Sequence, residues 1–236
     1  HNYFAKDETV KKEMAKATAR YLKTVLRDGE VLAVTGGTTL AEVARSFPTS
    51  GEKRDVMVVP ARGGLGEEVE KQANTVAANI AERLGGVYRL LHVPDDVGDD
   101  VIASLCSDPK IKEMLDLIKE TDMVLHGIGS AEEMAKRRGL SEDDLRLLRE
   151  KQAVGEAFGY YFNMKGDIVY STSSVGLRME DLTKIDKVVA VGGGHSKAEA
   201  ALAVMSNRYQ HVCITDEGAA RLMLARLEGI AKQRAK

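Results

Sequence analysis

Along this chain a short apolar segment is followed repeatedly by a turn containing glycine and then by a helical segment. In the clearest copy, residues 31–35 run into Gly36 and Gly37 and then into a helical stretch at 40–46. Strands that alternate with helices form a mainly parallel α/β sheet with helices on both faces, because parallel strands need crossover connections. Ligands of such sheets bind at the carboxyl ends of the strands. The expected strands are 31–35, 56–60, 87–93, 123–126, 188–191 and 212–215.

One region departs from this pattern. Tyr160, Phe162 and Met164 alternate with other residues, and Lys165 to Asp167 suit a hairpin turn, so residues 159–175 predict a small antiparallel insertion or edge. No internal repeat or low-complexity linker divides the sequence, and all 236 residues are expected to form one domain. The expected helices are 9–27, 40–46, one from near Glu67 to the glycines at 85 and 86, 132–139 and 141–152.

The composition excludes several classes of protein. Hydrophobic residues make up 44% and charged residues 30%, and no apolar run approaches the roughly 20 residues of a membrane span, which predicts a soluble protein without a membrane partner. The 34 Lys and Arg residues nearly balance the 36 Asp and Glu residues, which argues against DNA binding by this chain alone. Cys106 and Cys213 lack metal-ligand spacing, so we expect buried thiols in a reducing cytoplasm and neither a metal nor a cofactor.

The turn after the first expected strand is a candidate anion site. Gly36, Gly37, Thr38 and Thr39 open the next helix, where unpaired backbone amides and the helix dipole favour an anion. The two threonine hydroxyls add donors for phosphate oxygens. The alternative is a tight turn in which one threonine caps the helix. Neither a GxGxxG fingerprint nor a GxxxxGKS or GxxxxGKT loop is present, which argues against nucleotide binding.

Two cationic residues occupy similar places after later strands. Arg62 follows the second expected strand, and Gly63 and Gly64 after it let backbone approach a ligand. A guanidinium suits phosphate, although an isolated arginine is by default a surface residue. Lys197 is expected in the first turn of a helix, where a cation opposes the helix dipole. A bound phosphate or acid would explain it, and the alternative is a solvated lysine.

Three residues are candidates for acid or base chemistry at the same rim. His126, Glu156 and Asp216 each end or follow an apolar segment, but none has a partner visible in the sequence. A lone histidine after a strand is more often structural. Glu156 could accept hydrogen bonds from sugar hydroxyls or cap a helix, and Asp216 is expected to cap the last helix.

The charged run from Lys136 to Arg138 is typical of a solvated helix face. One of its arginines could still reach a second phosphate. Spacing does not choose between Arg137 and Arg138.

Five motifs together resemble the effector-binding domain of the SorC-type sugar-responsive repressors, and the resemblance covers nearly the whole chain. Any one of the motifs alone would be weak, but all five occur in the family's order. The motifs are VTGGTT at 34–39, PARGGLG at 60–66, GIGSA at 127–131, GGGHSK at 192–197 and ITDE at 214–217.

The resemblance implies a fold similar to glucosamine-6-phosphate deaminase and ribose-5-phosphate isomerase, with a sensing pocket above the carboxyl edge of the sheet. It also implies a phosphorylated sugar as effector, and fructose-1,6-bisphosphate for the members that control glycolytic genes. The resemblance further implies that Thr38, Thr39 and Arg62 bind one phosphate. Arg137 and Lys197 are implied to make further phosphate contacts, and Gln72 and Glu156 to bind the sugar hydroxyls. The implied lining of the site also includes Gly36, Gly37, Gly63 and Gly129.

The family's N-terminal helix-turn-helix module has no counterpart here, and the sequence starts at His1 without a methionine or a signal segment. We therefore expect operator DNA to be reached only through a module that precedes this segment. Repressors pair DNA-binding heads on two half-sites, so a homodimer or tetramer in the cytoplasm is expected.

Three hypotheses follow. The first is a sensing module in which a phosphosugar shifts the equilibrium between conformations or oligomers. The alternative is an isomerase or deaminase type of enzyme on the related fold, which would need acid and base residues that converge from distant segments. The third is an oligomerisation domain whose glycine turns bind nothing.

Overall fold

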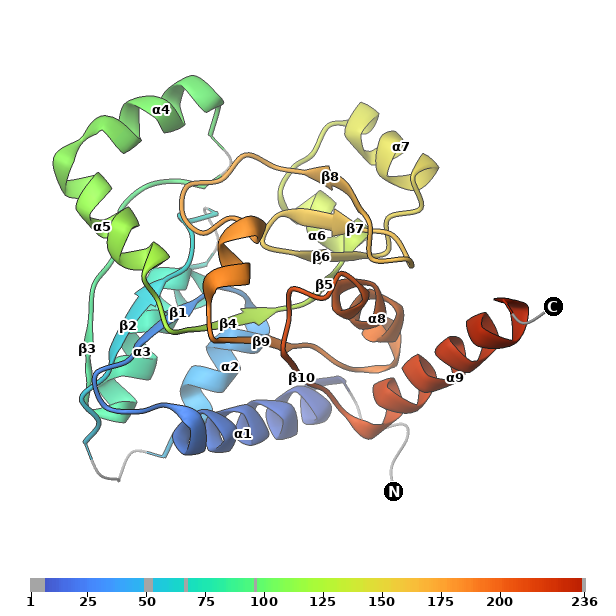
Figure 1. The fold of residues 1–236 in the computed structure, drawn as a ribbon, viewed down its shortest axis with the longest axis horizontal. Helices are drawn as coiled ribbons and strands as arrows, with labels where there is room; N and C mark the ends of the chain where they lie inside the picture. Colours follow the sequence, from blue (N-terminus) through green and yellow to red (C-terminus); the bar gives the residue numbers. More distant parts are fainter. Residues whose placement is uncertain (1–6, 49–52, 66–67, 96, 235–236) are drawn as a thin grey trace.

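The computed structural model describes residues 7–48, 53–65, 68–95 and 97–234. Within these residues the main sheet has six strands, all parallel (Figure 1). The expected mainly parallel α/β sheet is therefore confirmed. In spatial order the strands are β10 (Val212–Ile214), β9 (Lys187–Val191), β4 (Met123–Gly127), β1 (Val31–Val34), β2 (Met57–Pro60) and β3 (Val87–Tyr88).

The strand order reverses direction between β1 and β4. From β1 the chain adds β2 and β3 on one side, then returns to β4 and adds β9 and β10 on the other side. Connections that leave a sheet in opposite directions open a crevice beyond the carboxyl ends of the two strands where the reversal occurs. The topology thus fixes where a ligand can bind before any side chain is considered.

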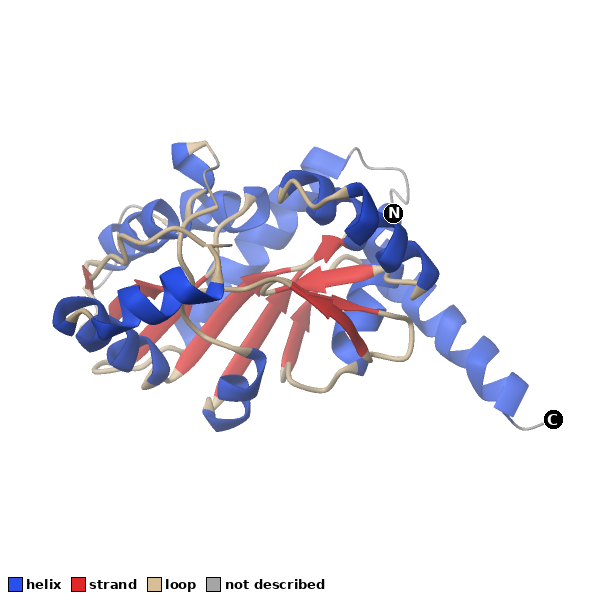
Figure 2. Cartoon of the chain, turned by 90° about the horizontal axis from the view of Figure 1, so that it is seen from above, coloured by secondary structure: helices blue, strands red, loops and turns tan. Residues whose placement is uncertain are grey.

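Each face of the sheet has its own core, because successive strand residues point to opposite sides. On one face Leu32 and Val34 of β1 pack with α1 (Asp7–Val25), α2 (Thr38–Ser46) and α3 (Ala73–Leu84). On the other face lie Ala33 and Val124. They share a core with residues of α5 (Pro109–Lys119), the 3-10 helix η2 (Met179–Lys184) and α8 (Ala198–Ser206). Figure 2 shows helices along both faces of the fanned strands.

The predicted antiparallel region is a separate sheet and not an edge of the main one. Its order is β5 (Gly129–Ser130), β6 (Gly155–Ala157), β7 (Tyr160–Phe162) and β8 (Ile168–Ser171). The hairpin expected at Lys165 to Asp167 joins β7 and β8 and is confirmed. The turn between β6 and β7 consists of Phe158 and Gly159, with φ of 57° and 77°. Positive φ at both central residues is the geometry of a type I′ hairpin.

Some expected boundaries are wrong for identifiable reasons. The strand expected at 87–93 ends at Tyr88, because the side-chain amide of Asn74 pairs with both the N–H and the C=O of Leu91 at 3.0 Å and replaces a strand partner. The helix after Arg62 begins only at Ala73, preceded by the 3-10 helix η1 (Val69–Lys71); Glu67 lies outside the described residues. It ends at Gly85 in the left-handed conformation, as expected.

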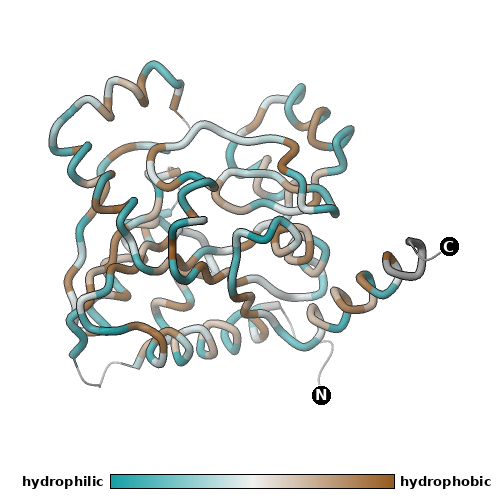
Figure 3. Tube along the Cα trace, viewed as in Figure 1, coloured by the Kyte–Doolittle hydropathy of each residue, from teal (hydrophilic) through white to brown (hydrophobic). Residues whose placement is uncertain are grey.

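Several helices lie outside the predictions or differ slightly from them. α4 (Asp99–Ser107) and α5 were not anticipated, and α4 contains no fully buried residue within the described part of the chain. α6 (Ala131–Arg137) and α7 (Glu142–Glu150) match expected helices. α9 (Glu217–Arg234) extends away from the body of the domain (Figures 1 and 2). Figure 3 shows apolar residues recurring along α9, and of these Leu224 and Leu227 are exposed.

The cysteines are less buried than expected. Cys106 and Cys213 are both half-buried and free, and they pack at the margin of one core. Burial raises the pKa of Cys213 to about 11, so its thiol stays protonated at neutral pH. Among the described residues, no helix combines the length and the apolar character that crossing a bilayer requires.

The antiparallel sheet docks on α8 through a glycine. A Cβ added at Gly155 would lie 2.7 Å from the carbonyl oxygen of Ala200. We therefore expect Gly155→Ala to lower the free energy of unfolding by about 1–3 kcal/mol through overpacking. Gly229→Ala in α9 is the control: its added Cβ meets no atom. In a helix it should gain about 0.5–1 kcal/mol. Urea unfolding measures both, and equal stabilities of the two variants would contradict the expectation.

Candidate functional site

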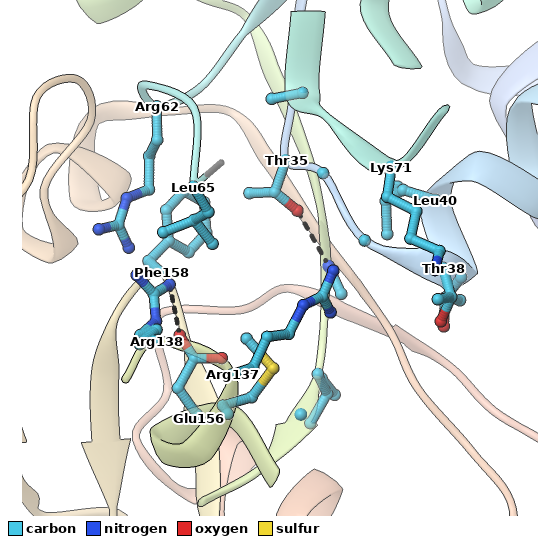
Figure 4. Close-up of a pocket in the computed structure, with 18 of the residues that line it drawn as sticks. Thr35, Thr38, Leu40, Arg62, Leu65, Lys71, Arg137, Arg138, Glu156 and Phe158 are labelled. Atoms are coloured by element: carbon cyan, nitrogen blue, oxygen red, sulfur yellow. Dashed lines mark hydrogen bonds and ion pairs between the residues drawn. The ribbon is translucent and has the colours of Figure 1, made fainter. Parts of the chain in front are cut away.

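A pocket lies at the carboxyl ends of β1, β2 and β4, in the crevice that the strand order predicts (Figure 4). The empty space in and above it, with the open solvent at its mouth included, is about 800 Å³. Every residue proposed as a ligand contact lines it, although binding by these residues stays a prediction. They are Gly36, Gly37, Thr38, Thr39, Arg62, Gly63, Gln72, Gly129, Arg137, Glu156 and Lys197.

The N-terminus of α2 forms one wall. Gly37 occupies the N-cap position with φ of 109°, and within the described residues no side chain caps the helix. The alternative in which a threonine caps α2 is therefore wrong. Thr38 and Thr39 are instead the first two helical residues, so their amides have no acceptor within the helix. This is the local geometry that favours an anion.

The two glycines before α2 have a packing role as well. The Gly37 amide donates to the carbonyl oxygen of Lys71 at 2.7 Å, so this amide is already engaged. A Cβ at Gly36 would collide with the same Lys71 carbonyl. The turn therefore lies directly against η1, and the amides of Thr38 and Thr39 are the ones that have no acceptor within the helix.

The opposite wall holds a buried chain of alternating charges. Arg62 Nη2 lies 2.7 Å from Asp95 Oδ2, and Arg138 Nη1 lies 3.7 Å from the same oxygen. Arg138 Nη2 in turn donates to Glu156 Oε1 at 3.2 Å. All four side chains are 6% exposed or less. The alternative of Arg62 as a surface arginine is therefore wrong, and so is that of Glu156 as a helix cap, since Glu156 lies on β6.

Neighbouring groups hold the two carboxylates in place. Asp95 Oδ1 accepts hydrogen bonds from the Ser174 hydroxyl at 2.8 Å and from the Val175 amide at 3.3 Å. Glu156 Oε1 accepts one from the Gly159 amide at 2.5 Å. A Cβ at Gly159 would lie 2.6 Å from Arg62 Nη1, so the glycine of the β6–β7 hairpin makes room for the guanidinium.

The arginines at the end of α6 have different surroundings. Arg138 belongs to the buried charge network, whereas Arg137 extends across the pocket between that network and the start of α2 (Figure 4). Lys197 ends the 3-10 helix η3 (His195–Lys197), one residue before α8 and not within its first turn. Its side chain is 27% exposed and lies 3.7 Å from Glu133, so it is not fully solvated.

The charge of the pocket favours an anionic ligand. Its lining includes five cationic side chains, Arg62, Lys71, Arg137, Arg138 and Lys197, but only three carboxylates, Asp95, Glu133 and Glu156. The formal charge of these groups is therefore positive, although the chain as a whole is slightly negative. Low-dielectric walls concentrate such a local field.

Asp95 was not among the predicted site residues, because it has no local motif and meets Arg62 only in the folded chain. A signal was present, because Asp95 follows the buried Val93 after an expected strand, as Arg62 does. Phe158 also lines the pocket, and no sequence motif predicted it there.

His126 is not at the rim as expected. It is fully buried on the face of β4 that carries the antiparallel sheet, with its ring 4.9 Å from that of Phe158 and Nδ1 2.9 Å from the Gly127 carbonyl oxygen. Burial lowers the pKa of His126 to about 4, against a smaller opposing effect of the Gly127 carbonyl. Asp216 has the expected capping role: it accepts hydrogen bonds from the amides of Ala219, at 3.1 Å, and Gly194, at 2.5 Å.

Comparisons with known proteins agree with this picture. The family described as "Putative sugar-binding domain" matches residues 3–225. The chain is 48% identical over 213 residues to the central glycolytic genes regulator of Priestia megaterium, covering 90% of this chain and 62% of that protein. It is 44% identical to the protein of the same name from Bacillus subtilis over 215 residues, or 91% of this chain and 63% of that protein. It thus spans about three fifths of these relatives.

A solved structure is also similar. A SorC family transcriptional regulator from Enterococcus faecalis superposes with a TM-score of 0.84 at 41% identity, over 93% of this chain and 90% of that one. The proteins to which this chain is similar are transcriptional regulators and not enzymes.

His126 gives the stability of the domain a pH dependence. Its folded pKa of about 4 lies below its ordinary value of 6.5, so between these values the unfolded chain binds the proton more readily. The stabilisation from neutral His126 is complete above pH 6.5 and should be lost as the pH falls toward 4, by on the order of 2–3 kcal/mol. His126→Gln should remove this slope. His92→Gln, at an exposed position, should retain it. Urea unfolding at pH 7 and 4.5 tests this, and an unchanged slope in His126→Gln would contradict it.

Proposed function

Because the chain belongs to the sugar-binding domain family of the SorC-type transcriptional regulators, we propose that it is the effector-sensing domain of a repressor of glycolytic genes. Its effector is a phosphorylated sugar that binds in the pocket at the carboxyl ends of β1, β2 and β4. Fructose-1,6-bisphosphate is the proposed ligand, since a sugar with two phosphates fits a site with two separate groups of donors.

The observation that carries this proposal is that one pocket combines the uncapped N-terminus of α2 with an excess of cationic side chains. Thr38 and Thr39 offer amides and hydroxyls for one phosphate. Arg62 lies in the charge network on the opposite wall of the pocket, and Arg137 lies between that network and the start of α2 (Figure 4). Charge-assisted hydrogen bonds from guanidinium to phosphate are among the stronger polar contacts in proteins.

The remaining contacts concern the sugar and the mouth of the pocket. Lys197 is proposed to contact a phosphate, and Gln72 and Glu156 the sugar hydroxyls. Glu156 suits this role because Oε1 is held by Arg138 and Gly159, which fixes the orientation of the carboxylate beside β5. Between Arg137 and Arg138, we assign the ligand contact to Arg137.

The regulatory proposal extends beyond the pocket. Residues 1–236 form the effector-binding and oligomerisation unit of a cytoplasmic regulator, and operator DNA is contacted by a separate module of the whole protein. Binding of the effector in the pocket changes the self-association of the domain, and thereby the affinity of the whole protein for the two half-sites of its operator. The exposed Leu224 and Leu227 on the outlying helix α9 are the proposed contact with a second copy.

A ligand panel on the wild type and the variant Arg137→Ala tests the effector. Fructose-1,6-bisphosphate at 100 times its dissociation constant should stabilise the wild type by about 2.7 kcal/mol, a rise in Tm of roughly 5–11 °C. Arg137→Ala should weaken binding by about 1.5–3 kcal/mol, because it removes a hydrogen bond to a charged group.

Arg149→Ala is the matched control, since it removes an exposed arginine on α7 that does not line the pocket. It should bind as the wild type does. Fructose-6-phosphate, glucose-6-phosphate, dihydroxyacetone phosphate and free fructose complete the panel. No shift with any phosphate would refute the proposed function, and a shift that Arg137→Ala leaves unchanged would refute the assigned contact.

Sedimentation velocity tests the proposed oligomer. The wild type should sediment as a dimer or tetramer, and Leu224→Asp combined with Leu227→Asp should shift it toward the monomer, because charges would face an apolar contact. The exposed Val101→Asp on α4 is the control and should leave the distribution unchanged. A wild type that is monomeric at all concentrations, with and without fructose-1,6-bisphosphate, would contradict the proposal.

A further inference from the structure

We propose that Asp95 is an internal counter-ion of the effector pocket, which holds Arg62 when no effector is bound and is replaced by a phosphate group of the effector. This inference rests on the proposed function and adds to it a mechanism by which the pocket reports its own occupancy.

The first support is the way two guanidinium groups share one carboxylate oxygen. Asp95 Oδ2 lies 2.7 Å from Arg62 and 3.7 Å from Arg138, while Oδ1 is taken by Ser174 and Val175. Both Asp95 and Arg62 line the pocket, and their side chains are only 1% and 5% exposed. The ion pair therefore forms part of the wall against which a ligand would lie.

The second support is electrostatic. A buried charge without a partner is costly, so a guanidinium at this depth needs an anion in every state of the protein. In the structure Asp95 supplies that anion. A phosphate, with more oxygens and more charge, can supply it instead, and Asp95 keeps Ser174, Val175 and Arg138 as partners when Arg62 turns to the ligand.

The third support is the position of Asp95 where three loops meet. The loop after β2 pairs with the loop that precedes α4: the Gly64 amide donates to Val93 O at 3.0 Å, and the Asp95 amide to Gly64 O at 2.7 Å. The same loop pairs with a third segment, since the Gly63 amide donates to Val175 O at 2.9 Å. The Arg62–Asp95 ion pair joins the first two of these loops, and we call the place where the three loops meet the junction.

The junction continues into α4. The Ser173 hydroxyl donates to Asp99 in the first turn of α4 at 2.9 Å, and within the described residues α4 has no fully buried side chain to anchor it. A change in the Arg62–Asp95 pair is therefore adjacent to a helix whose apolar side chains, such as Ile102 and Leu105, are only partly buried. If a phosphate replaced Asp95 as the partner of Arg62, the ion pair between the loop after β2 and the loop that precedes α4 would be lost.

Asp95→Asn tests the proposal, because asparagine keeps an acceptor for Ser174 and Val175 but removes the competing charge. We expect isothermal titration to show tighter binding of fructose-1,6-bisphosphate, on the order of tenfold, as expected for loss of one charged contact that the ligand must displace. We also expect a lower Tm without ligand, because Arg62 loses its buried partner. A residue that only positioned Arg62 would give weaker binding instead.

Asp100→Asn is the matched control. It removes one negative charge from an exposed position in the first turn of α4, outside both the Arg62–Asp95 pair and the Ser173–Asp99 hydrogen bond. It should bind fructose-1,6-bisphosphate as the wild type does, so that tighter binding by Asp95→Asn alone excludes a general effect of net charge.

Crystals of the wild type with fructose-1,6-bisphosphate provide a second measurement that does not depend on how Asp95→Asn folds. Arg62 should contact a phosphate and lie beyond ion-pair distance of Asp95. Binding by the wild type with unchanged or weaker binding by Asp95→Asn, or an intact Arg62–Asp95 pair beside bound ligand, overturns this proposal alone. No binding by the wild type overturns the proposed function together with it.

Discussion

The guanidinium groups of Arg62 and Arg138 lie buried beside the pocket, and the structure around them keeps each of them paired. Arg62 and Arg138 converge on Asp95, and Arg138 also pairs with Glu156. These residues come from the loop after β2, the segment before α4, the end of α6 and strand β6. Since an unpaired buried charge costs several kcal/mol, the network fixes how the antiparallel sheet sits over the parallel one. The pocket is the space left between that network and α2.

The same arrangement gives a nearly neutral chain a pocket lined by more cationic than anionic side chains. The strand order places the turns after β1 and β4 on either side of one crevice. The uncapped start of α2 supplies amides to one wall, and cationic side chains exceed carboxylates among the lining residues. Attraction for an anion is thus a local property of the crevice. The balance of charges over the whole sequence says little about it.

Much of this could be predicted from the sequence, because it depends on local patterns. The period of apolar residues and the glycine turns gave five of the six parallel strands nearly to their ends, and the edge strand β3 was predicted too long. Candidate contacts such as Thr38 and Arg62 follow strands or open helices, and in a parallel sheet such positions gather at one edge. Arg137, at the end of α6, and Glu156, on β6, do not fit this rule. Errors arose where a side chain replaced a backbone partner, as Asn74 does for Leu91, or where helices such as α4 carry a weak apolar pattern.

The sequence by itself determined the class of fold, through the spacing of its apolar segments and glycine turns, and the family, through five shared motifs. It also gave many of the residues that line the pocket, but not Asp95 or Phe158. Only the tertiary structure decided how those residues are paired. It showed that Arg62 is buried against Asp95, that Arg138 joins the network while Arg137 crosses the pocket, and that His126 lies in the core. These contacts join segments far apart in the chain, and burial sets their strength, so no local pattern of residues encodes them.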